Sequence, residues 1–367
     1  MNNVKYTVLP DRVLLIDNNV IISYKKGNLY YRKSISDKPR FICRLPGGFF
    51  QCIGTKISII ERLLRLEPRF AMPYKESLIY LSSHGKLFII DYKTGSIEVV
   101  HEYRNKMHNP LNVCIVKNLK GFEDGLYYGE YWGNTAHEAV SVYHVDGRVS
   151  KKVYTFPAGS ILHIHAIFEN KKNDELILLT GDSDNESAVW SIRDGFKRVE
   201  RICGGNQQYR SCCAYVDDHS LYYTTDTPLE HNYLYKYDID QENLVRVYPL
   251  PGPSIYYMQK LTKSNKNMFV FSTSVEPDSR LVGGWKYRLS REKAPGVEDL
   301  YSHVFMAIDG KLKEIVKFKK DWLPFQLFQF GNVRIPYQNN SENMLFLSPQ
   351  GVEKLHGKTV VVKIEEA

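Results

Sequence analysis

Several features that mark other classes of protein are missing from this chain of 367 residues. It has no run of roughly 18 apolar residues, so we expect no membrane-spanning helix. The opening stretch MNNVKYTVLPDRVLLIDNNVIISY lacks a basic segment followed by an apolar one and a cleavage site. No signal peptide is therefore visible, and we expect a cytoplasmic protein. The GxSxG, HExxH, P-loop and dinucleotide-binding motifs are also absent, which excludes the enzyme classes that depend on them.

Cysteine is scarce, and none of the six cysteines belongs to a CxxC pair. Most of them lie in apolar, strand-like contexts. This pattern predicts buried free thiols in a reducing compartment and argues against a structural zinc site or a disulfide framework. The cysteines are Cys43, Cys52, Cys114, Cys203, Cys212 and Cys213.

Charge is not concentrated anywhere in the chain, although the net charge is +8. Lysine and arginine alternate with acidic residues and form no basic stripe, so we expect no nucleic-acid partner. The positive excess allows an anionic partner without identifying one. No feature predicts self-association, and we expect a monomer.

Aromatic residues are abundant, with 26 Tyr and 17 Phe, while long Ala, Leu, Glu and Lys-rich stretches are rare. This composition favours strands. Segments such as SLIYLSSHGKLFIIDYKTGSIEVV and ELILLTGDSDNESAVWSIRDGFKRVERI repeat one order: an apolar run, a polar loop, a second run, a tight turn and a third run. Each is preceded by one more short apolar strand. Four antiparallel strands per unit, with a period of roughly 40 to 50 residues, predict β-propeller blades.

Counting these units gives an all-β, seven-bladed propeller with four-stranded antiparallel blades and a single domain over residues 1–367. The predicted first strands of the last two blades are IYYMQKL at Ile255 and FQLFQF at Phe325. KISIIERLLRLE, residues 56–67, has helical spacing and predicts an insertion between blades. The ring is expected to close by pairing the early VKYTVL with the C-terminal KTVVVKI, because closure removes an exposed sheet edge.

Blade geometry predicts which polar residues meet. The start of the first strand and the loop joining the second strand to the third open on the same face of the ring. His163 and His165 begin one first strand, and Asp182 lies in the second-to-third loop of the same blade. The residues that this rule places on the face, as candidates for substrate binding, are Arg69, Asn112, Trp132, Asn134, His137, Asp182, Asp226, His231, Asn232, Tyr256 and Gln329.

Two chemical interpretations of this face are open. No definite cofactor is implied, but His163, His165 and Asp182 could hold a divalent cation, since imidazole and carboxylate are common metal ligands. Trp132 and Asn134, in YWGN, could offer an aromatic platform for a sugar ring beside an amide, or Trp132 could be a packing residue between blades.

The stretches HIHAIFENKKNDELILLTGDSDNESAVW and QQYRSCCAYVDDHSLYYTTDTPLEHNYLYKYD resemble BNR-repeat, sialidase-like propellers associated with polysaccharide loci. A weaker resemblance is to the seven-bladed ulvan and oligogalacturonide lyases. This second resemblance implies elimination from a uronate polysaccharide. His163 or His165 would be the base, Tyr209 the acid and Arg210 the clamp on the carboxylate.

The expected partner is thus a polysaccharide or oligosaccharide, and three functions compete. The first is lyase-type β-elimination on an anionic glycan. The second is glycoside hydrolysis by paired carboxylates on the same face, which requires two carboxyl groups about 5 to 10 Å apart. The third is a non-catalytic propeller that binds glycan or protein.

Overall fold

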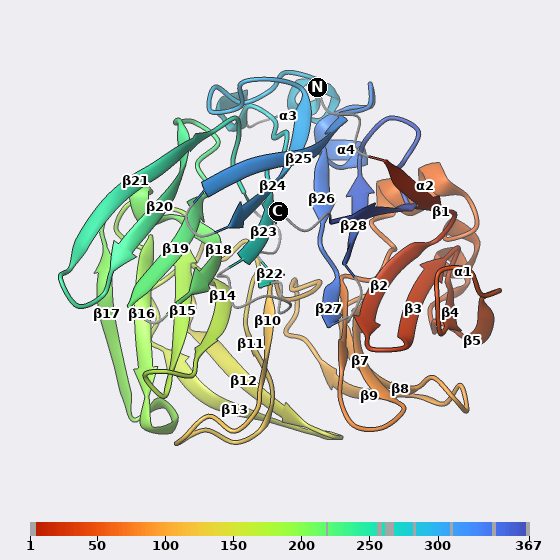
Figure 1. Cartoon of the computed structure of the whole chain (residues 1–367), viewed down its shortest axis with the longest axis horizontal. Coiled ribbons are helices and arrows are strands. Elements are labelled where there is room, and N and C mark those ends of the chain that lie inside the picture. Colours follow the sequence, from red (N-terminus) through yellow and green to blue (C-terminus); the bar gives the residue numbers. More distant parts are fainter. Residues whose placement is uncertain are drawn as a thin grey trace.

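The computed structural model describes residues 5–217, 219–254, 259–260, 268–281, 284–308, 311–339 and 343–364. Within these ranges the chain forms seven sheets arranged in a ring as a seven-bladed β-propeller (Figure 1), which confirms the predicted fold class. In chain order the blades are β2 to β5, β6 to β9, β10 to β13, β14 to β17, β18 to β21, β22 to β25, and β26, β28, β29 and β1.

The strands alternate with tight turns, as the repeat predicts. In blades one to four they are β2 (Arg12–Asp17), β3 (Val20–Lys25), β4 (Asn28–Arg32), β5 (Arg40–Arg44), β6 (Phe70–Pro73), β7 (Leu78–Ser83), β8 (Lys86–Asp91), β9 (Ile97–Glu102), β10 (Val113–Val116), β11 (Gly125–Gly129), β12 (Val140–Asp146), β13 (Val149–Phe156), β14 (His163–Asn170), β15 (Glu175–Gly181), β16 (Ala188–Arg193) and β17 (Arg198–Gly204). In blades five to seven they are β18 (Ser211–Val216), β19 (Ser220–Thr225), β20 (Asn232–Asp238), β21 (Asn243–Leu250), β22 (Gln259–Lys260), β23 (Met268–Ser272), β24 (Tyr301–Ile308), β25 (Lys311–Lys319), β26 (Asn332–Arg334), β28 (Met344–Gln350), β29 (Thr359–Lys363) and β1 (Tyr6–Leu9).

Burial follows the position of a strand within its blade. The second strand of blade four, β15, is buried along its whole length, because neighbouring blades cover both of its faces. The fourth strand of blade three, β13, mixes exposed and partly buried positions at the rim and ends on buried Phe156. Near-continuous apolar runs therefore mark middle strands, and mixed runs mark the outermost strands.

The ring closes as predicted. β1 pairs antiparallel with β29, with Tyr6 opposite Val362 and Leu9 opposite Thr359. Thr359 also ties this last blade to the first, since its hydroxyl accepts a hydrogen bond from the Val13 amide at 2.7 Å. All six cysteines are free, and four of them are buried as expected, whereas Cys52 and Cys203 are partly exposed.

Three local features differ from the sequence prediction. FQLFQF does not form the first strand of blade seven: Phe325–Phe328 is the short helix α4, and the inner strand β26 begins at Asn332. Phe325 is buried with Val275 and Val297, which explains why the segment packs instead of pairing.

The insertion before blade two contains helix α1 (Phe49–Gly54) as well as α2 (Ser58–Leu64), and only α2 falls within the predicted residues. Blade one gains a fifth strand, β27 (Tyr337–Asn339), parallel to β2.

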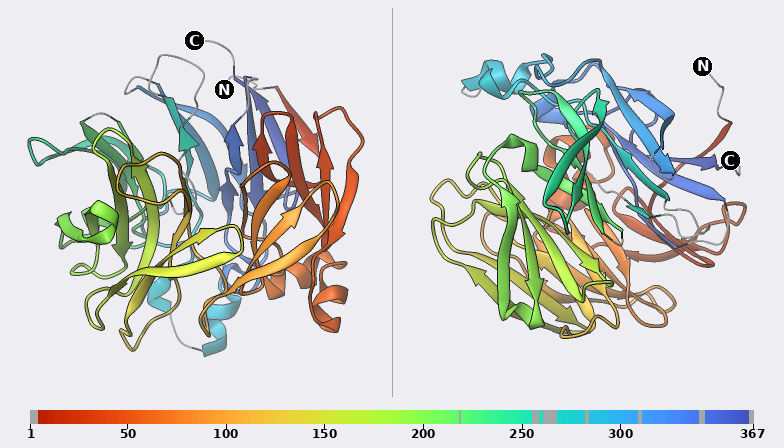
Figure 2. Two further views of the ribbon diagram at one scale, coloured as in Figure 1. Left: turned by 90° about the horizontal axis from the view of Figure 1, so that it is seen from below. Right: turned by 60° about the vertical axis from the view of Figure 1, so that its left-hand side comes forward.

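The two faces of the ring differ. We call the face where the inner strands begin the front face, and the face where they end the back face. α1 and α2 precede β6, α4 precedes β26, and α3 (Gly284–Leu289) lies in the long β23–β24 connection, so all four belong to the front. Figure 2, left, shows the orange and cyan helices together on one side of the ring. Among the described residues, no helix is long and apolar enough to cross a membrane.

Candidate functional site

A pair of buried histidines forms the centre of the candidate site on the front face. The side chains of His163 and His165 are almost fully buried, and their Nε2 atoms lie 3.0 Å apart. His163 Nδ1 is 3.0 Å from the Trp132 carbonyl, and His165 Nδ1 is 2.8 Å from the Ser211 carbonyl. Since a carbonyl only accepts, each Nδ1 carries the proton and donates it. Each ring therefore turns its Nε2 atom toward the other.

A β-bulge brings the two rings together. The register between β14 and β15 shifts so that Ile164 pairs with Thr180 and Ala166 with Leu179, which leaves His165 as the extra residue. Such bulges re-aim a side chain and are common beside functional sites. The ring of His165 also requires a glycine opposite: a Cβ on Gly181 would lie 2.6 Å from His165 Cε1.

Asp182 completes the cluster from the start of the β15–β16 loop. Its Oδ1 lies 3.2 Å from His165 Nε2, and its Oδ2 lies 3.4 Å from His163 Nε2. Burial opposes ionisation, but hydrogen bonds from both histidines, together with nearby Arg210, hold the pKa of Asp182 well below its usual range. The three residues offer two nitrogens and a carboxylate oxygen within 4.8 Å of one another. This donor set could hold a metal ion, and the Nδ1 bonds to carbonyls are the outer contacts that metal-binding histidines usually make.

A second layer of ionisable groups lies beside the cluster. Arg210 Nη2 is 3.2 Å from Asp182 Oδ1 and 3.8 Å from Asp226 Oδ2. Asp226 also accepts a hydrogen bond from the thiol of Cys212 at 3.1 Å. Burial raises the pKa of Asp226, and burial together with the Asp226 charge raises the pKa of Glu276. The layer therefore sets an ionised carboxylate, Asp182, beside two buried carboxyl groups whose pKa values are raised.

Three predicted residues, Trp132, Asn134 and His137, come from the β11–β12 connection, and their roles differ. Trp132 is buried, and the Arg104 guanidinium lies 3.9 Å from its ring centroid, so its ring packs within the protein. Asn134 is buried with its amide bonded to the backbone of Glu138 and Leu162. The aromatic ring against His163 belongs to Tyr131, with centroids 4.4 Å apart.

His137 is nearly half exposed and lies 2.9 Å from Glu186 Oε1, on the loop that carries Asp182. It therefore borders the cluster without joining it. Sequence reasoning placed YWGN at this face but selected Trp132 instead of Tyr131. A tryptophan in an apolar run is more often buried than the tyrosine beside it, and that signal could have separated the two.

The predicted residues of blade five also differ in their roles: some reach the histidine cluster, and others pack or hold a loop away from it. Arg210 and Asp226 reach the cluster, whereas Tyr209 packs against the apolar cluster that includes Tyr223 and Tyr235. Asn232 is fully buried and holds the β19–β20 loop through bonds to Thr227, Glu230 and Gly296. His231 is exposed beside it. Tyr256 lies outside the described residues.

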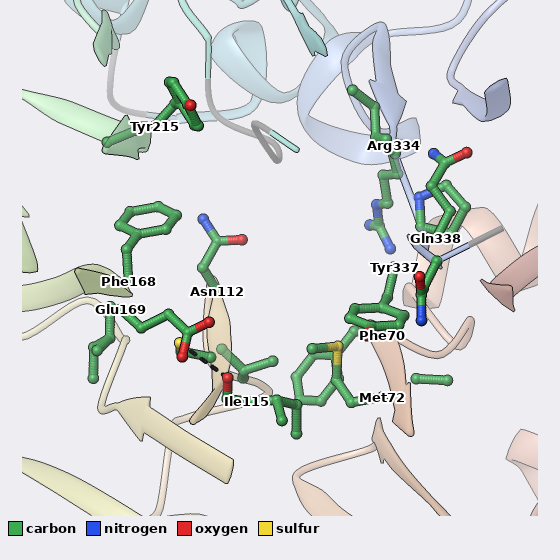
Figure 3. Close-up of a pocket in the computed structure, with 18 of the residues that line it drawn as sticks. Phe70, Met72, Asn112, Ile115, Phe168, Glu169, Tyr215, Arg334, Tyr337 and Gln338 are labelled. Atoms are coloured by element: carbon green, nitrogen blue, oxygen red, sulfur yellow. Dashed lines mark hydrogen bonds between the residues drawn. The ribbon is translucent and has the colours of Figure 1, made fainter. Parts of the chain in front are cut away.

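The remaining predicted residues line or border the channel. Asn112 Nδ2 donates to the Cys212 carbonyl at 2.7 Å, and Arg69 Nη2 donates to the Leu111 carbonyl at 3.2 Å. Both line a cavity of about 600 Å³ between the inner strands (Figure 3). Gln329 follows α4, not an inner strand, and donates its side-chain amide to Glu67. The prediction therefore combined two separate places: the histidine cluster and the channel.

Comparisons with known proteins give the fold and no family. No protein-family model matches the sequence, and no curated protein matches it either. An oligogalacturonate lyase from Vibrio parahaemolyticus is similar in structure, with 10% identity, a TM-score of 0.57, and coverage of 99% of this chain and 95% of that one. A chain of the mitotic checkpoint complex has 8% identity, a TM-score of 0.54, and coverage of 99% and 94%. The AfRom2 CNH domain has 7% identity, a TM-score of 0.52, and coverage of 99% and 98%.

These likenesses concern the propeller alone, because one fold hosts many functions. Membership in the BNR-repeat, sialidase-like family stays a prediction.

Proposed function

We propose that the protein is a carbohydrate-active propeller that binds uronate-containing oligosaccharides at the front-face cluster and cleaves them by β-elimination. The observation that carries the proposal is the facing pair of Nε2 atoms on His163 and His165, completed by Asp182. Three ligand atoms with fixed outer contacts suit a divalent cation. When bound, such a cation would neutralise a uronate carboxylate and so acidify the neighbouring C5–H bond.

The protein's own residues supply the rest of the reaction. Arg210 adds a positive charge beside the cluster and keeps Asp182 ionised. Elimination breaks the C5–H and C4–O bonds and forms a C4=C5 double bond, so one proton must leave C5 and one must reach the departing oxygen. We assign this proton exchange to Tyr131, whose partly buried ring contacts His163. Tyr209 is a weaker candidate because its ring packs against tyrosines between blades.

The lyase fold similarity is consistent with this chemistry, although at 10% identity it bears on architecture alone. A cation at the histidines removes them as candidates for the base, since their lone pairs would be occupied. Burial points the same way: His165 is 1% exposed and cannot reach a sugar directly.

Hydrolysis is the second candidate, and a separate observation favours it. Asp182 is held ionised, whereas the pKa values of Glu276 and Asp226 are raised by burial. Carboxyl groups with divergent pKa values are the arrangement that glycosidases use for acid and base.

One assay separates these functions. The purified protein is incubated with uronate-containing and neutral oligosaccharides, with Mn²⁺ or after treatment with a chelator, and both the ultraviolet absorbance of unsaturated sugars and the reducing ends are followed. Cation-dependent absorbance growth is the expected result. An increase in reducing ends without an increase in absorbance would indicate hydrolysis, with Asp182 and Glu276 as the reacting carboxyl groups. If neither the absorbance nor the reducing ends increase while calorimetry shows that an oligosaccharide binds, the protein is a binding module and the proposed enzymatic activity is refuted.

A further inference from the structure

The four helices of the front face are connected to one another, and we call them together the helical ridge. α1 packs against α2, α2 against α4, and α4 against α3. Hydrogen bonds join the same neighbours: Arg65, just after α2, donates to the Gln326 carbonyl of α4 at 3.3 Å, and the Gln326 side-chain amide donates to the Tyr287 hydroxyl of α3. Figure 2, left, shows the orange and cyan helices along the same side of the ring. The exposed side chains of the ridge therefore belong to one side of the molecule.

Large apolar side chains of the helical ridge are exposed to solvent. Phe49 and Phe50 of α1 are 74% and 83% exposed, and Trp285 of α3 is 69% exposed. More than half of the exposed large apolar residues of the described chain lie in the ridge, and they also include Ile53, Ile57, Leu63, Leu64, Leu289 and, in the loop before α4, Trp322. Soluble proteins rarely gather so many large apolar groups in one exposed region unless that region binds something.

Basic side chains flank these apolar groups. The exposed cations of the ridge and its adjoining loops include Arg44, Lys56, Arg65, Lys286, Arg288 and Arg291. Arg44 and Arg65 donate to backbone carbonyls, and Arg291 lies over the ring of Trp322. These contacts position the three guanidinium groups without neutralising their charge.

Acidic side chains also lie beside the ridge, and most of them are bonded within the protein. These acids and their partners are Glu61 with Tyr24, Glu67 with Gln329, Asp321 with Arg62 and Lys320, Asp278 with Arg280, and Asp299 with His303. Glu292 and Glu298, in the loop after α3, are exposed. Among the described residues, the exposed cations of this surface therefore outnumber its exposed acids, and the surface is both apolar and basic.

Charge decides which occupant fits this surface. In a two-fold dimer the same patch would meet itself, so the cations of one copy would lie near those of the other. Like charges brought together in an interface cost free energy. An anionic bilayer instead matches both properties: Phe, Trp and Leu side chains enter the boundary between headgroups and acyl chains, and lysine and arginine are attracted to the negative headgroups.

We propose that the helical ridge attaches the protein to an anionic lipid surface. Phe49, Phe50 and Trp285 enter the boundary between headgroups and acyl chains, and the exposed cations contact the headgroups. The attachment is to one leaflet and turns the front face of the ring toward the lipid. It does not depend on the proposed carbohydrate activity, because the ridge and the histidine cluster share no residue.

Sedimentation with lipid vesicles tests the proposal on the whole chain. The protein is expected to sediment with vesicles of phosphatidylcholine and phosphatidylglycerol mixed three to one, and at least tenfold more weakly with vesicles of phosphatidylcholine alone. High salt should weaken the binding, because it screens the headgroup charges. Equal binding to both kinds of vesicle, or no binding of the folded protein to the anionic ones, would overturn the proposal.

Variants of the exposed side chains locate the surface. Replacing Phe49 and Phe50 together, Phe49→Ser with Phe50→Ser, is expected to weaken binding to the anionic vesicles at least tenfold. The pair Lys286→Gln and Arg288→Gln should do the same on the basic side. Val149→Ser and Lys120→Gln, at exposed positions of the back face, are the matched controls and should bind like the wild type. Thermal unfolding checks that each variant folds.

Two further measurements separate the alternatives. His163→Asn should bind vesicles like the wild type while losing cation binding, so failure of the histidine site and failure of the ridge are told apart. Sedimentation velocity without lipid tests self-association: a dimer that Phe49→Ser with Phe50→Ser converts to a monomer, in a protein that does not bind vesicles, would assign the ridge to a second copy and overturn the lipid proposal. Unchanged vesicle binding in both folded double variants would also refute it.

Discussion

His163 and His165 face one another with their Nε2 atoms 3.0 Å apart, while both Nδ1 atoms are committed to backbone carbonyls. Two ring nitrogens at that distance, with the Asp182 carboxylate beside them, form a donor set that a cation can bind. We therefore expect Zn²⁺ or Mn²⁺ to bind with a stoichiometry near one and to raise the thermal midpoint of unfolding. His165→Asn should weaken cation binding at least tenfold. His231→Asn, at an exposed front-face histidine outside the cluster, serves as the control; equal loss in both variants would contradict the site.

Arg210 is expected to stabilise the layer of carboxyl groups behind the cluster. Arg210→Gln leaves ionised Asp182 and buried Asp226 without their cation, so it should lower the free energy of unfolding at pH 7.5 by about 3 kcal/mol. Because burial raises the pKa of Asp226, this carboxyl group takes up a proton more readily as the pH falls, and the loss should be smaller at pH 5. Urea unfolding at both pH values measures this effect. Adding Asp226→Asn should restore part of the stability, and a loss that is independent of pH would show that Arg210 acts by packing alone.

Tyr131 and Trp132 offer a matched pair of neighbours. Tyr131→Phe should reduce sugar cleavage at least tenfold with little change in stability, because only a hydroxyl is removed. Trp132→Phe weakens the stacking with Arg104 and should cost about 1 kcal/mol of stability while leaving sugar affinity unchanged. Kinetics and thermal unfolding of the two variants decide between them. A loss of sugar binding in Trp132→Phe would restore the sugar-platform interpretation.

The insertion before blade two has its own pH dependence. Burial is the main reason that the pKa of Glu61 rises to about 7, despite its 2.5 Å hydrogen bond from Tyr24. The folded state then holds a proton that the unfolded state releases above its ordinary pKa of about 4.3. Stability should therefore fall as pH rises from about 4.5 to 7, by about 1 to 3 kcal/mol. Glu61→Gln should flatten this part of the profile, measured as thermal midpoints. Glu102→Gln, at an exposed glutamate, should retain the slope.

The repeat of strands and turns was sufficient to predict the ring, because every blade shows the same order of apolar runs and tight turns in its sequence. The closing pair of β1 and β29 followed from the need to remove a sheet edge. FQLFQF could not be resolved in this way: a short, mainly apolar run fits a strand, but Phe325 and Phe328 also lie three apart, as on a helix. Contacts from the distant β23–β24 connection decided between the two.

The site was predicted in part for a similar reason. Strand direction placed His163, His165, Asp182, Arg210 and Asp226 on one face, and these five do meet. The sequence could not show that the side-chain amides of Asn134 and Asn232 are hydrogen-bonded to loop backbones. Nor could it show that Arg69 and Asn112 turn into the channel, since side-chain direction at a strand end depends on the neighbouring blades.

The pairing of β1 with β29 also sets an order of events during synthesis. β1 leaves the ribosome before every blade, but its partner is made only after six blades have appeared. An unpaired strand must therefore wait, exposed, while the rest of the ring assembles. During that interval β1 can pair with β29 of another chain, so exchange of β1 between two molecules is a misassembly that this closure permits.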